Sequence, residues 1–176
     1  MAVKLRTPLS RRDVRGLRAG DVVLLSGTVY TARDEAHRKI IDLASKGELP
    51  QALDLNGAVV YHCGPVVMRR NGRYEIVSAG PTTSWRMNRY LDSILSLGIR
   101  GVIGKGGMEA GPFRGRAVYF AFTGGAGALA AESIKEVKDV LWLDELGVPE
   151  AVWILEVRDM PLLVAIDTEG SSLYER

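Results

Sequence analysis

The chain has 176 residues, of which 47% are hydrophobic and 25% are charged, so it is long enough and apolar enough to form a core. Its formal net charge of +2 is too small to indicate nucleic-acid binding, and no apolar run approaches the length of a membrane span. The single cysteine, Cys63, excludes an internal disulfide and leaves too few ligands for a zinc site or an iron–sulfur cluster within the chain. No secretory signal opens the sequence, so we expect a cytoplasmic protein.

A basic segment begins the chain. Arginines at five positions between Arg6 and Arg18 are opposed by a single acidic residue, Asp13. We expect a loose arm over about residues 1–18 that faces solvent or a protein partner, with contact to nucleic acid or a membrane as the alternative. The rest of the chain shows no repeat, low-complexity tract or linker, which predicts one domain over residues 1–176.

The first organised unit is a strand, a loop and a helix. A short apolar run at residues 22–25 predicts the strand. From Asp34 onward the apolar residues recur at helical spacing until Gly47, which predicts a helix that ends there. The loop between the two elements has the sequence SGTVYTAR.

Two more strands and a second helix follow. Residues 58–61 and 74–78 are apolar runs that end near glycine and proline, and Asn71-Gly72 predicts a tight turn before the second run. The segment SWRMNRYLDSILSLG places apolar residues at i, i+3, i+4, i+7 and i+8, which predicts an amphipathic helix that ends at Gly98.

The last third of the chain alternates in the same way. It predicts a short strand in IRGVIG, a strand at residues 117–122, and a helix after the glycine-rich turn TGGAG. Two further strands, at 151–157 and 162–167, are joined by a turn at DMP. Because helices and strands are interleaved, the sequence indicates an α/β fold.

Several predicted strands end in glycine-rich loops that carry cations. Arg33, Arg86 and Lys105 lie in or beside three of these loops. Ligands of α/β sheets bind at the carboxyl ends of strands, and glycine-rich turns can direct backbone N–H groups at an anion. Two guanidinium groups suit a dicarboxylate, because each can hold one carboxylate through two N–H donors. These residues predict a site for a small anionic metabolite.

The same loops also have structural interpretations. Arg33 could pair with Asp34 or Glu35 at the helix end, and Lys105 could be an ordinary surface lysine. The GKGG sequence lacks the glycine spacing of a Walker loop, and TGGAG matches only half of a dinucleotide-binding fingerprint. Packing of that turn against a helix is the favoured interpretation.

Hydroxyl groups and a His-Cys pair leave further alternatives. Thr83 or Ser84 is suited to cap the helix that follows it, because both side chains can accept a backbone N–H bond. His62 and Cys63 are adjacent at a strand end and could be metal ligands. Two ligands are too few for a metal site, so a buried pair with satisfied polar atoms is favoured, and we assign no metal ligand to this chain.

Four segments taken together resemble the iron–sulfur hydro-lyases, in particular the β subunits of class I fumarate hydratase and of L(+)-tartrate dehydratase. In chain order they are SGTVYTARDEAHRKI, AGPTTSWRMNRYLD, GVIGKGGM and EVRDMPLLVAIDTEG. The resemblance runs from about Leu17 to Leu173 and corresponds to the C-terminal domain of one-chain members. It implies a swivelling β/β/α domain with a central sheet flanked by helices.

The resemblance also implies an activity and a partner. The expected reaction is the reversible hydration of fumarate to (S)-malate, and the alternative is the dehydration of tartrate or another hydroxy-diacid. A 4Fe–4S cluster held by cysteines of an α subunit would act as the Lewis acid. We therefore expect an α₂β₂ enzyme with its active site between the α and β subunits, and a β chain that is inactive alone.

Carried over to this sequence, the resemblance assigns roles to residues of the cationic loops. Thr82 would abstract the substrate proton, and because threonine is a weak base it would need a nearby cation such as Arg86. Arg86 would also bind one substrate carboxylate and Arg33 the other, with Lys105 adding positive charge. The implied substrate-binding residues are Arg33, Thr83, Arg86, Lys105, Gly80 and Gly106.

Some assignments remain open from the sequence. It does not distinguish which of Thr82, Thr83 and Ser84 abstracts the proton and which caps the helix. Trp85 stands before Arg86, where smaller or more flexible residues are common in the family, and it either narrows the pocket or packs. His37 lies in the first motif and has no assigned role beyond holding its loop.

Overall fold

A computed structural model describes residues 1–122 and 127–174 of the chain. Helices and strands are interleaved along these residues, so the predicted α/β class is confirmed. The strands are β1 (Val3–Arg6), β2 (Val22–Thr31), β3 (Val59–Tyr61), β4 (Val66–Arg70), β5 (Arg73–Ser78), β6 (Gly101–Gly104), β7 (Val118–Ala121), β8 (Ile134–Leu141) and β9 (Val152–Ile166). The helices are α1 (Arg11–Arg15), α2 (Asp34–Ser45), α3 (Asn88–Leu95), α4 (Gly127–Ser133) and α5 (Leu143–Leu146), with 3₁₀ turns η1 (Trp85–Met87) and η2 (Gly111–Phe113).

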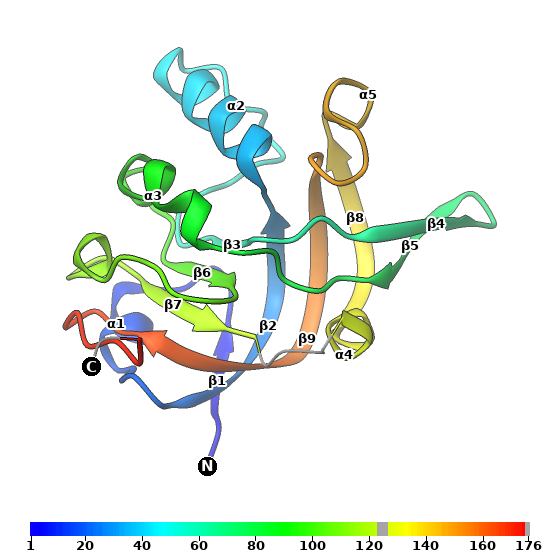
Figure 1. Cartoon of the computed structure of the whole chain (residues 1–176). Helices are drawn as coiled ribbons and strands as arrows, with labels where there is room; N and C mark the ends of the chain where they lie inside the picture. Colours follow the sequence, from blue (N-terminus) through cyan, green and yellow to red (C-terminus); the bar gives the residue numbers. More distant parts are fainter. Residues whose placement is uncertain (123–126, 175–176) are drawn as a thin grey trace.

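The main sheet closes on itself. In the described part of the chain its strand order is β1-β2-β3-β6-β7-β9-β8, and β9 also pairs with β2. Strands β2, β3, β6 and β7 run parallel, whereas β9 is antiparallel to both β2 and β7. These five strands therefore form a ring, with β1 added beside β2 and β8 beside β9 (Figure 1).

Side chains of the ring alternate between two buried clusters. The row Val60, Val102 and Tyr119 crosses β3, β6 and β7 and belongs to the cluster formed with α2 and α3. The next row, one residue further along each strand, belongs to the cluster inside the ring. Helices α2 and α3 lie beside each other over the outer face (Figure 1). This double burial explains why these strands appear in the sequence as short continuous apolar runs.

The basic N-terminal segment is packed against the body, so the expected loose arm is wrong for most of its length. Strand β1 pairs with β2, and α1 begins with a capping box in which Ser10 and Asp13 exchange hydrogen bonds of 2.7 and 3.1 Å. Apolar residues lie between the arginines of this segment, and their burial anchors it. Its buried members are Leu5, Leu9, Val14 and Leu17.

Two strands are longer than predicted. The expected loop SGTVYTAR is strand as far as Thr31, because β9 pairs along both halves of β2. The expected turn at DMP is an irregularity inside one continuous strand, β9, in which Asp159 adopts a φ of 48°. One extra residue on β9 is accommodated opposite Leu25 and Gly27, so this feature is a β-bulge.

Other predicted elements are present with modest changes. Helix α2 is followed by Gly47 at φ 67°, and the second predicted helix is divided into η1 and α3 before Gly98 at φ 100°. Asn71 and Gly72, at φ 53° and 75°, form the predicted tight turn between β4 and β5. Most of the turn TGGAG lies outside the described residues. No helix in residues 1–122 or 127–174 is long and apolar enough to cross a membrane.

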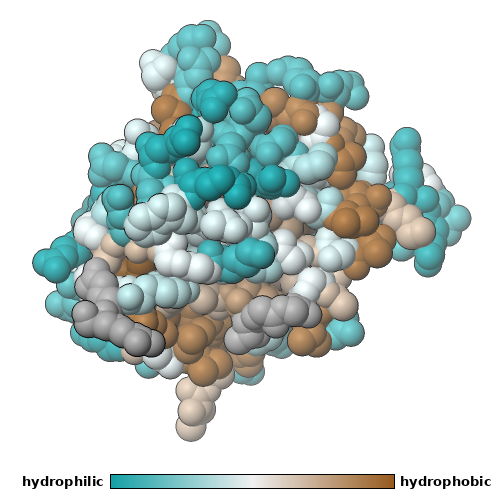
Figure 2. Space-filling view, viewed as in Figure 1, coloured by the Kyte–Doolittle hydropathy of each residue, from teal (hydrophilic) through white to brown (hydrophobic). Residues whose placement is uncertain are grey.

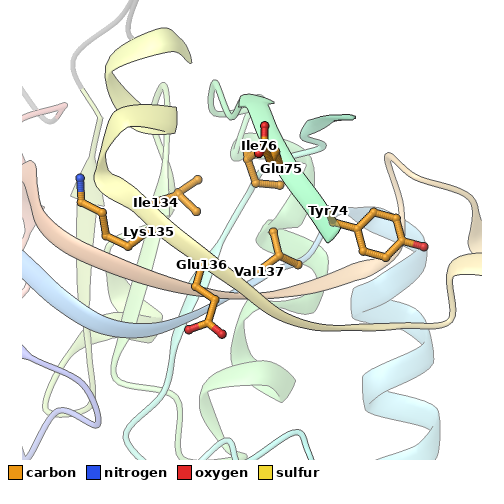
Figure 3. A pocket seen from close by; sticks show the side chains of 7 residues that line it. All are labelled: Tyr74, Glu75, Ile76, Ile134, Lys135, Glu136 and Val137. Atoms are coloured by element: carbon orange, nitrogen blue, oxygen red, sulfur yellow. The ribbon is translucent and has the colours of Figure 1, made fainter. Parts of the chain in front are cut away.

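The β4–β5 hairpin extends away from the ring beside β8 (Figure 1). A cavity of about 290 Å³ lies between β5 and β8, with Ile134 and Val137 of β8 on one side and Ile76 of β5 on the other (Figure 3). None of the site residues predicted from the sequence lines this cavity. The candidate site therefore lies elsewhere, at the ends of the ring strands.

Candidate functional site

The carboxyl ends of the parallel ring strands meet at one edge of the sheet. The register pairs Thr31 of β2 with Tyr61 of β3, and β3 is in turn paired with β6. Arg33 follows β2, His62 follows β3 and Lys105 follows β6. Strand β9 is antiparallel and therefore begins at the same edge. The topology thus brings the predicted cationic loops together, as expected for an α/β sheet.

Arg86, Thr82 and Asp34 form the central contact of the site. Nη2 of Arg86 donates to Oδ2 of Asp34 at 3.2 Å and, at a long 3.5 Å, to Oγ1 of Thr82. Asp34 is the first residue of α2, whereas Thr82 and Arg86 flank the start of η1. Arg86 and Thr82, which were predicted to act together, are therefore neighbours. Asp34, at the start of α2, holds Arg86 in place.

A short parallel pairing fixes the loop that carries Thr82 and Thr83. The backbone N–H of Thr82 donates to the carbonyl of His62 at 2.7 Å, and Thr83 is bridged to Lys105. Thr82 is half-buried, whereas Thr83 and Lys105 are exposed. The structure therefore places Thr82, Thr83, Arg86 and Lys105 beside one another.

Ser84 is a buried structural residue and does not cap the helix. Its Oγ accepts the backbone N–H of Lys105 at 3.2 Å and lies 2.8 Å from Nδ1 of His62. Neither η1 nor α3 has a side-chain cap hydrogen bond, so the predicted cap by Thr83 or Ser84 is wrong. The hydroxyl accepts from Lys105 through one lone pair, and its direction toward Nδ1 of His62 is set by the tautomer of the imidazole.

The close approach of Ser84 depends on a glycine in β6. A Cβ added to Gly104 would lie 1.7 Å from Oγ of Ser84 and 3.1 Å from Nδ1 of His62. The buried serine thus occupies the space that a side chain at Gly104 would need. This interlock joins the β6 loop to the threonine loop.

A second histidine extends the buried polar chain. The ring of His37 lies 5.3 Å from that of His62, centroid to centroid, and Nδ1 of His37 is 2.7 Å from the carbonyl oxygen of Arg33. Tyr90 stacks on the other side of His37 at 5.5 Å. His37 is thus tied to the Arg33 backbone, which agrees with its expected part in holding the first loop.

The two histidines have low proton affinity. Burial lowers the pKa of His37, against a smaller opposing effect of the Arg33 carbonyl. Burial also lowers the pKa of His62 well below its ordinary value, and two smaller effects add to this: repulsion from His37 in its protonated form and from the positive charge of Arg86. Both rings are therefore neutral near pH 7.

We expect the chain to lose stability as pH falls below about 6.5. There the unfolded chain binds protons at both histidines more readily than the folded chain does, so each contributes a slope of up to about 1.4 kcal/mol per pH unit in the free energy of unfolding. Denaturant unfolding between pH 7.5 and 5.5 measures this slope, and His37→Gln should make it shallower. A constant free energy over this interval would contradict the assignment of two buried neutral histidines.

Arg33 is partly buried and pairs with a residue that the sequence did not suggest. Its Nε lies 3.4 Å from Oε1 of Glu150, which stands just before β9. The expected pairing of Arg33 with Asp34 or Glu35 is wrong, because Asp34 pairs with Arg86 and Glu35 pairs with Arg38. The substrate role proposed for Arg33 remains a prediction.

The other predicted residues have distinct surroundings. Gly106 has a φ of 74°, and its carbonyl accepts the hydroxyl of Tyr119 at 2.8 Å. A Cβ added to Gly80 would lie 3.7 Å from Cα of Gly127 at the start of α4, and the predicted contact of Gly80 with substrate remains a prediction. The Trp85 residue is 59% exposed, so it does not pack into the core. Hydrophilic side chains gather over α2 and α3 on the face seen in Figure 2.

Cys63 has the properties of a structural thiol. It is fully buried, and burial raises its pKa to about 12. The neighbouring residue, His62, is hydrogen-bonded through Nδ1 to the hydroxyl of Ser84. Across residues 1–122 and 127–174, no group of three His, Cys, Asp or Glu side chains could hold a metal ion. The described residues therefore do not fit a metal or an iron–sulfur cluster.

Sequence reasoning missed the residues that orient the cations. Asp34 stands within a motif that was singled out, but its contact with Arg86 spans 52 positions. Glu150 is 117 positions from Arg33 and follows Gly-Val-Pro, which carries no signal beyond a turn. The pairing of Ser84 with Gly104 has no local signal, since it depends on the parallel alignment of two loops.

Comparison with known proteins identifies the family of the chain. The family model described as "Fumarase C-terminus" matches residues 1–176, and the chain belongs to this family. It is 47% identical over 95% of its length to "Putative L(+)-tartrate dehydratase subunit beta" of Methanocaldococcus jannaschii, of which 88% is covered. It is 41% identical over 96% of its length to "L(+)-tartrate dehydratase subunit beta" of Escherichia coli K12, of which 85% is covered. A 40% identical match to "Putative fumarate hydratase class I" of Geobacillus stearothermophilus covers 98% of this chain and 34% of that protein.

Proposed function

We propose that this chain is the β subunit of a two-subunit hydro-lyase that hydrates fumarate to (S)-malate. The observation that carries the proposal is the grouping of Arg86, Thr82 and Lys105 at one edge of the sheet. Relatives of nearly equal length are named as β subunits, and a longer relative is named as a fumarate hydratase, which supports a hydro-lyase with a separate partner chain.

The substrate contacts follow from charge. One carboxylate of the dicarboxylate binds Arg86 and the other binds Arg33, while Lys105 increases the positive potential between them. In the malate-to-fumarate direction, Thr82 acts as its alkoxide, having lost its own proton to solvent; it removes the proton from the carbon next to a held carboxylate and becomes the neutral hydroxyl. The cation of Arg86, 3.5 Å from Oγ1 of Thr82, stabilises the alkoxide before the transfer. In the hydration direction the hydroxyl returns this proton to the carbon.

The partner supplies what this chain lacks. Cys63 is the single cysteine and is buried, so an iron–sulfur cluster would have to be held by the α subunit. Such a cluster would supply Lewis-acid chemistry. The isolated β chain would accordingly be inactive, and the assembly would be α₂β₂.

Tartrate dehydration is the second candidate, favoured by the names of the two relatives that match this chain over most of their length. The arrangement of acceptors supports fumarate. The two acidic side chains nearest the cations, Asp34 and Glu150, are already engaged by Arg86 and Arg33. Within residues 1–122 and 127–174, the site then offers donors for carboxylates, and neither Asp34 nor Glu150 is free to receive the second hydroxyl of tartrate.

Co-expression with the cysteine-bearing partner tests both candidates. The complex should be purified without oxygen, analysed for iron, and assayed with fumarate, malate and tartrate. Rapid turnover of fumarate and malate supports the proposal, and faster turnover of tartrate selects the second candidate. An iron-containing complex that acts on none of these acids would reject both.

Arg86→Ala should raise the KM and lower the kcat of that complex, each by about tenfold or more, because a charge-assisted contact is lost in the ground and transition states. Arg89→Ala is the matched control, since Arg89 lies three residues further on, in α3, and packs over Tyr90. Steady-state kinetics with fumarate measures both variants. Equal kinetics for the two would remove Arg86 from the substrate site.

A further inference from the structure

We propose that Glu150 is a positioning residue that sets the orientation of the Arg33 guanidinium. The proposal rests on the function proposed above, in which Arg33 holds a substrate carboxylate. Glu150 lies before β9 and Arg33 lies after β2, so the antiparallel pairing of these strands brings the two side chains together.

The carboxylate of Glu150 makes two contacts, one with the Arg33 side chain and one with the backbone of Glu35 in α2. Oε1 of Glu150 lies 3.4 Å from Nε of Arg33, and Oε2 accepts the backbone N–H of Glu35 at 3.1 Å. Nε of Arg33 is buried and has no hydrogen-bond partner among residues 1–122 and 127–174, so the ion pair with Glu150 compensates for its burial. Arg33 and Glu150 are both largely buried, with 29% and 21% of their side-chain surface exposed. The pair is therefore better shielded from water than an ordinary surface ion pair.

The position of Glu150 is set by its own turn. The backbone N–H groups of Glu150 and Ala151 both donate to the carbonyl of Gly147, at 3.2 and 2.8 Å. Thr31 at the end of β2 accepts the backbone N–H of Trp153 at 2.9 Å, which fixes the start of β9 against the Arg33 loop. The carboxylate is thus held by rigid elements on both sides.

The Arg33 side chain passes over a glycine to reach this carboxylate. A Cβ added to Gly64 would lie 2.8 Å from Nη1 and 3.0 Å from Cδ of Arg33. The carbonyl of Pro149 lies on the same side, 3.0 Å from that Cβ position. Arg33 is therefore confined between Gly64 and the Pro149-Glu150 segment.

This confinement determines which edge of the Arg33 guanidinium is left to bind a carboxylate. A guanidinium can offer either Nε with one Nη atom or its two Nη atoms together. With Glu150 on the Nε edge, the end with both Nη atoms remains for the substrate. In the described residues neither Nη atom of Arg33 donates a hydrogen bond, so that end is available.

A purely structural role for Glu150, as an acceptor at the start of α2, makes a different prediction. Glu150→Gln keeps an oxygen that can accept the N–H of Glu35 but removes the charge that holds Arg33. Glu145→Gln is the matched control, because Glu145 also reaches α2, where it contacts Nζ of Lys39 at 2.7 Å. A structural role would leave substrate binding unchanged in Glu150→Gln.

Steady-state kinetics of the αβ complex tests the proposal through a double-mutant cycle. Glu150→Gln should raise the KM about tenfold with a smaller effect on kcat, whereas Glu145→Gln should match the wild type. In an Arg33→Ala background, Glu150→Gln should have no further effect. An unchanged KM, or the same increase in both backgrounds, would overturn the proposal.

A second measurement separates this proposal from the proposed function. The ¹⁵Nε–H signal of Arg33 can be followed by NMR in the full chain, without any assay. Glu150→Gln should shift or broaden this signal, while Glu145→Gln should leave it in place. If the wild-type complex acts on no dicarboxylate but the signal behaves this way, the proposed function fails and the positioning contact stands. A signal unaffected by Glu150→Gln rejects the contact itself.

Discussion

Gly104→Ala should destabilise the chain by about 2–4 kcal/mol and abolish turnover of the assembled enzyme. The added Cβ would lie 1.7 Å from Oγ and 3.0 Å from Cβ of Ser84, and rotation of the Ser84 side chain would move Oγ but leave the close contact with its Cβ. Ser84 would have to move, which would break its contacts with His62 and with the backbone N–H of Lys105. The buried His62 and the partly buried N–H of Lys105 would then lose these contacts, which adds to the cost of overpacking.

Denaturant unfolding and steady-state kinetics measure the two effects. Gly107→Ala is the control, since a Cβ there would meet Tyr174 only at 3.7 Å, an ordinary contact distance. Ser84→Ala combined with Gly104→Ala should recover part of the stability, because it removes the closest clash. If Gly104→Ala were as stable as Gly107→Ala, the interlock between Ser84 and Gly104 would not hold the two loops together.

The local parts of the fold were predictable because their signals are contained in short windows. The period of the apolar residues and Gly47 defined α2, and Asn71-Gly72 defined the hairpin turn. The short apolar run at residues 58–61 defined β3 because both faces of that strand are buried. Each of these signals reflects backbone conformation or burial within a few residues.

Elements that depend on distant partners were missed. Strand β1 and α1 are short and rich in arginine, and their stability comes from pairing with β2 and from burial of four apolar side chains. The continuity of β9 across Asp159 depends on the ring that it closes with β2. Neither feature has a local signature, because propensity is overridden by tertiary contacts.

The same division applies to the candidate site. Its cations were found because they lie in glycine-rich loops after strands, a placement that the strand pattern predicts. The groups that orient them were not found, since Glu150 meets Arg33 through the antiparallel strand β9, which was predicted as two separate strands. Thr83 or Ser84 was predicted to cap the helix because capping is the usual local role of a hydroxyl residue at that position, and the contact with the distant His62 gives Ser84 a different role.

Thr82→Val should lower the kcat of the complex by about 10²–10⁴-fold with little change in KM. The substitution keeps the shape of the side chain and removes the hydroxyl proposed to accept the substrate proton. Arg86 would keep its contact with Asp34 at 3.2 Å, so the carboxylate grip should survive. Thr28→Val is the control, because Thr28 is a half-buried threonine of β2 whose hydroxyl contacts Lys138 away from the site.

The primary isotope effect with malate deuterated at the reacting carbon identifies the step that is lost. It should increase in Thr82→Val, because proton abstraction then limits the rate, and it should be unchanged in Thr28→Val. Thr83→Val resolves the choice between the two neighbouring hydroxyls, since Thr83 is exposed and bridged to Lys105. Full turnover in Thr82→Val together with a large loss in Thr83→Val would transfer the role to Thr83. Ser84 is not a third candidate, because its hydroxyl is buried against His62 and the backbone of Lys105.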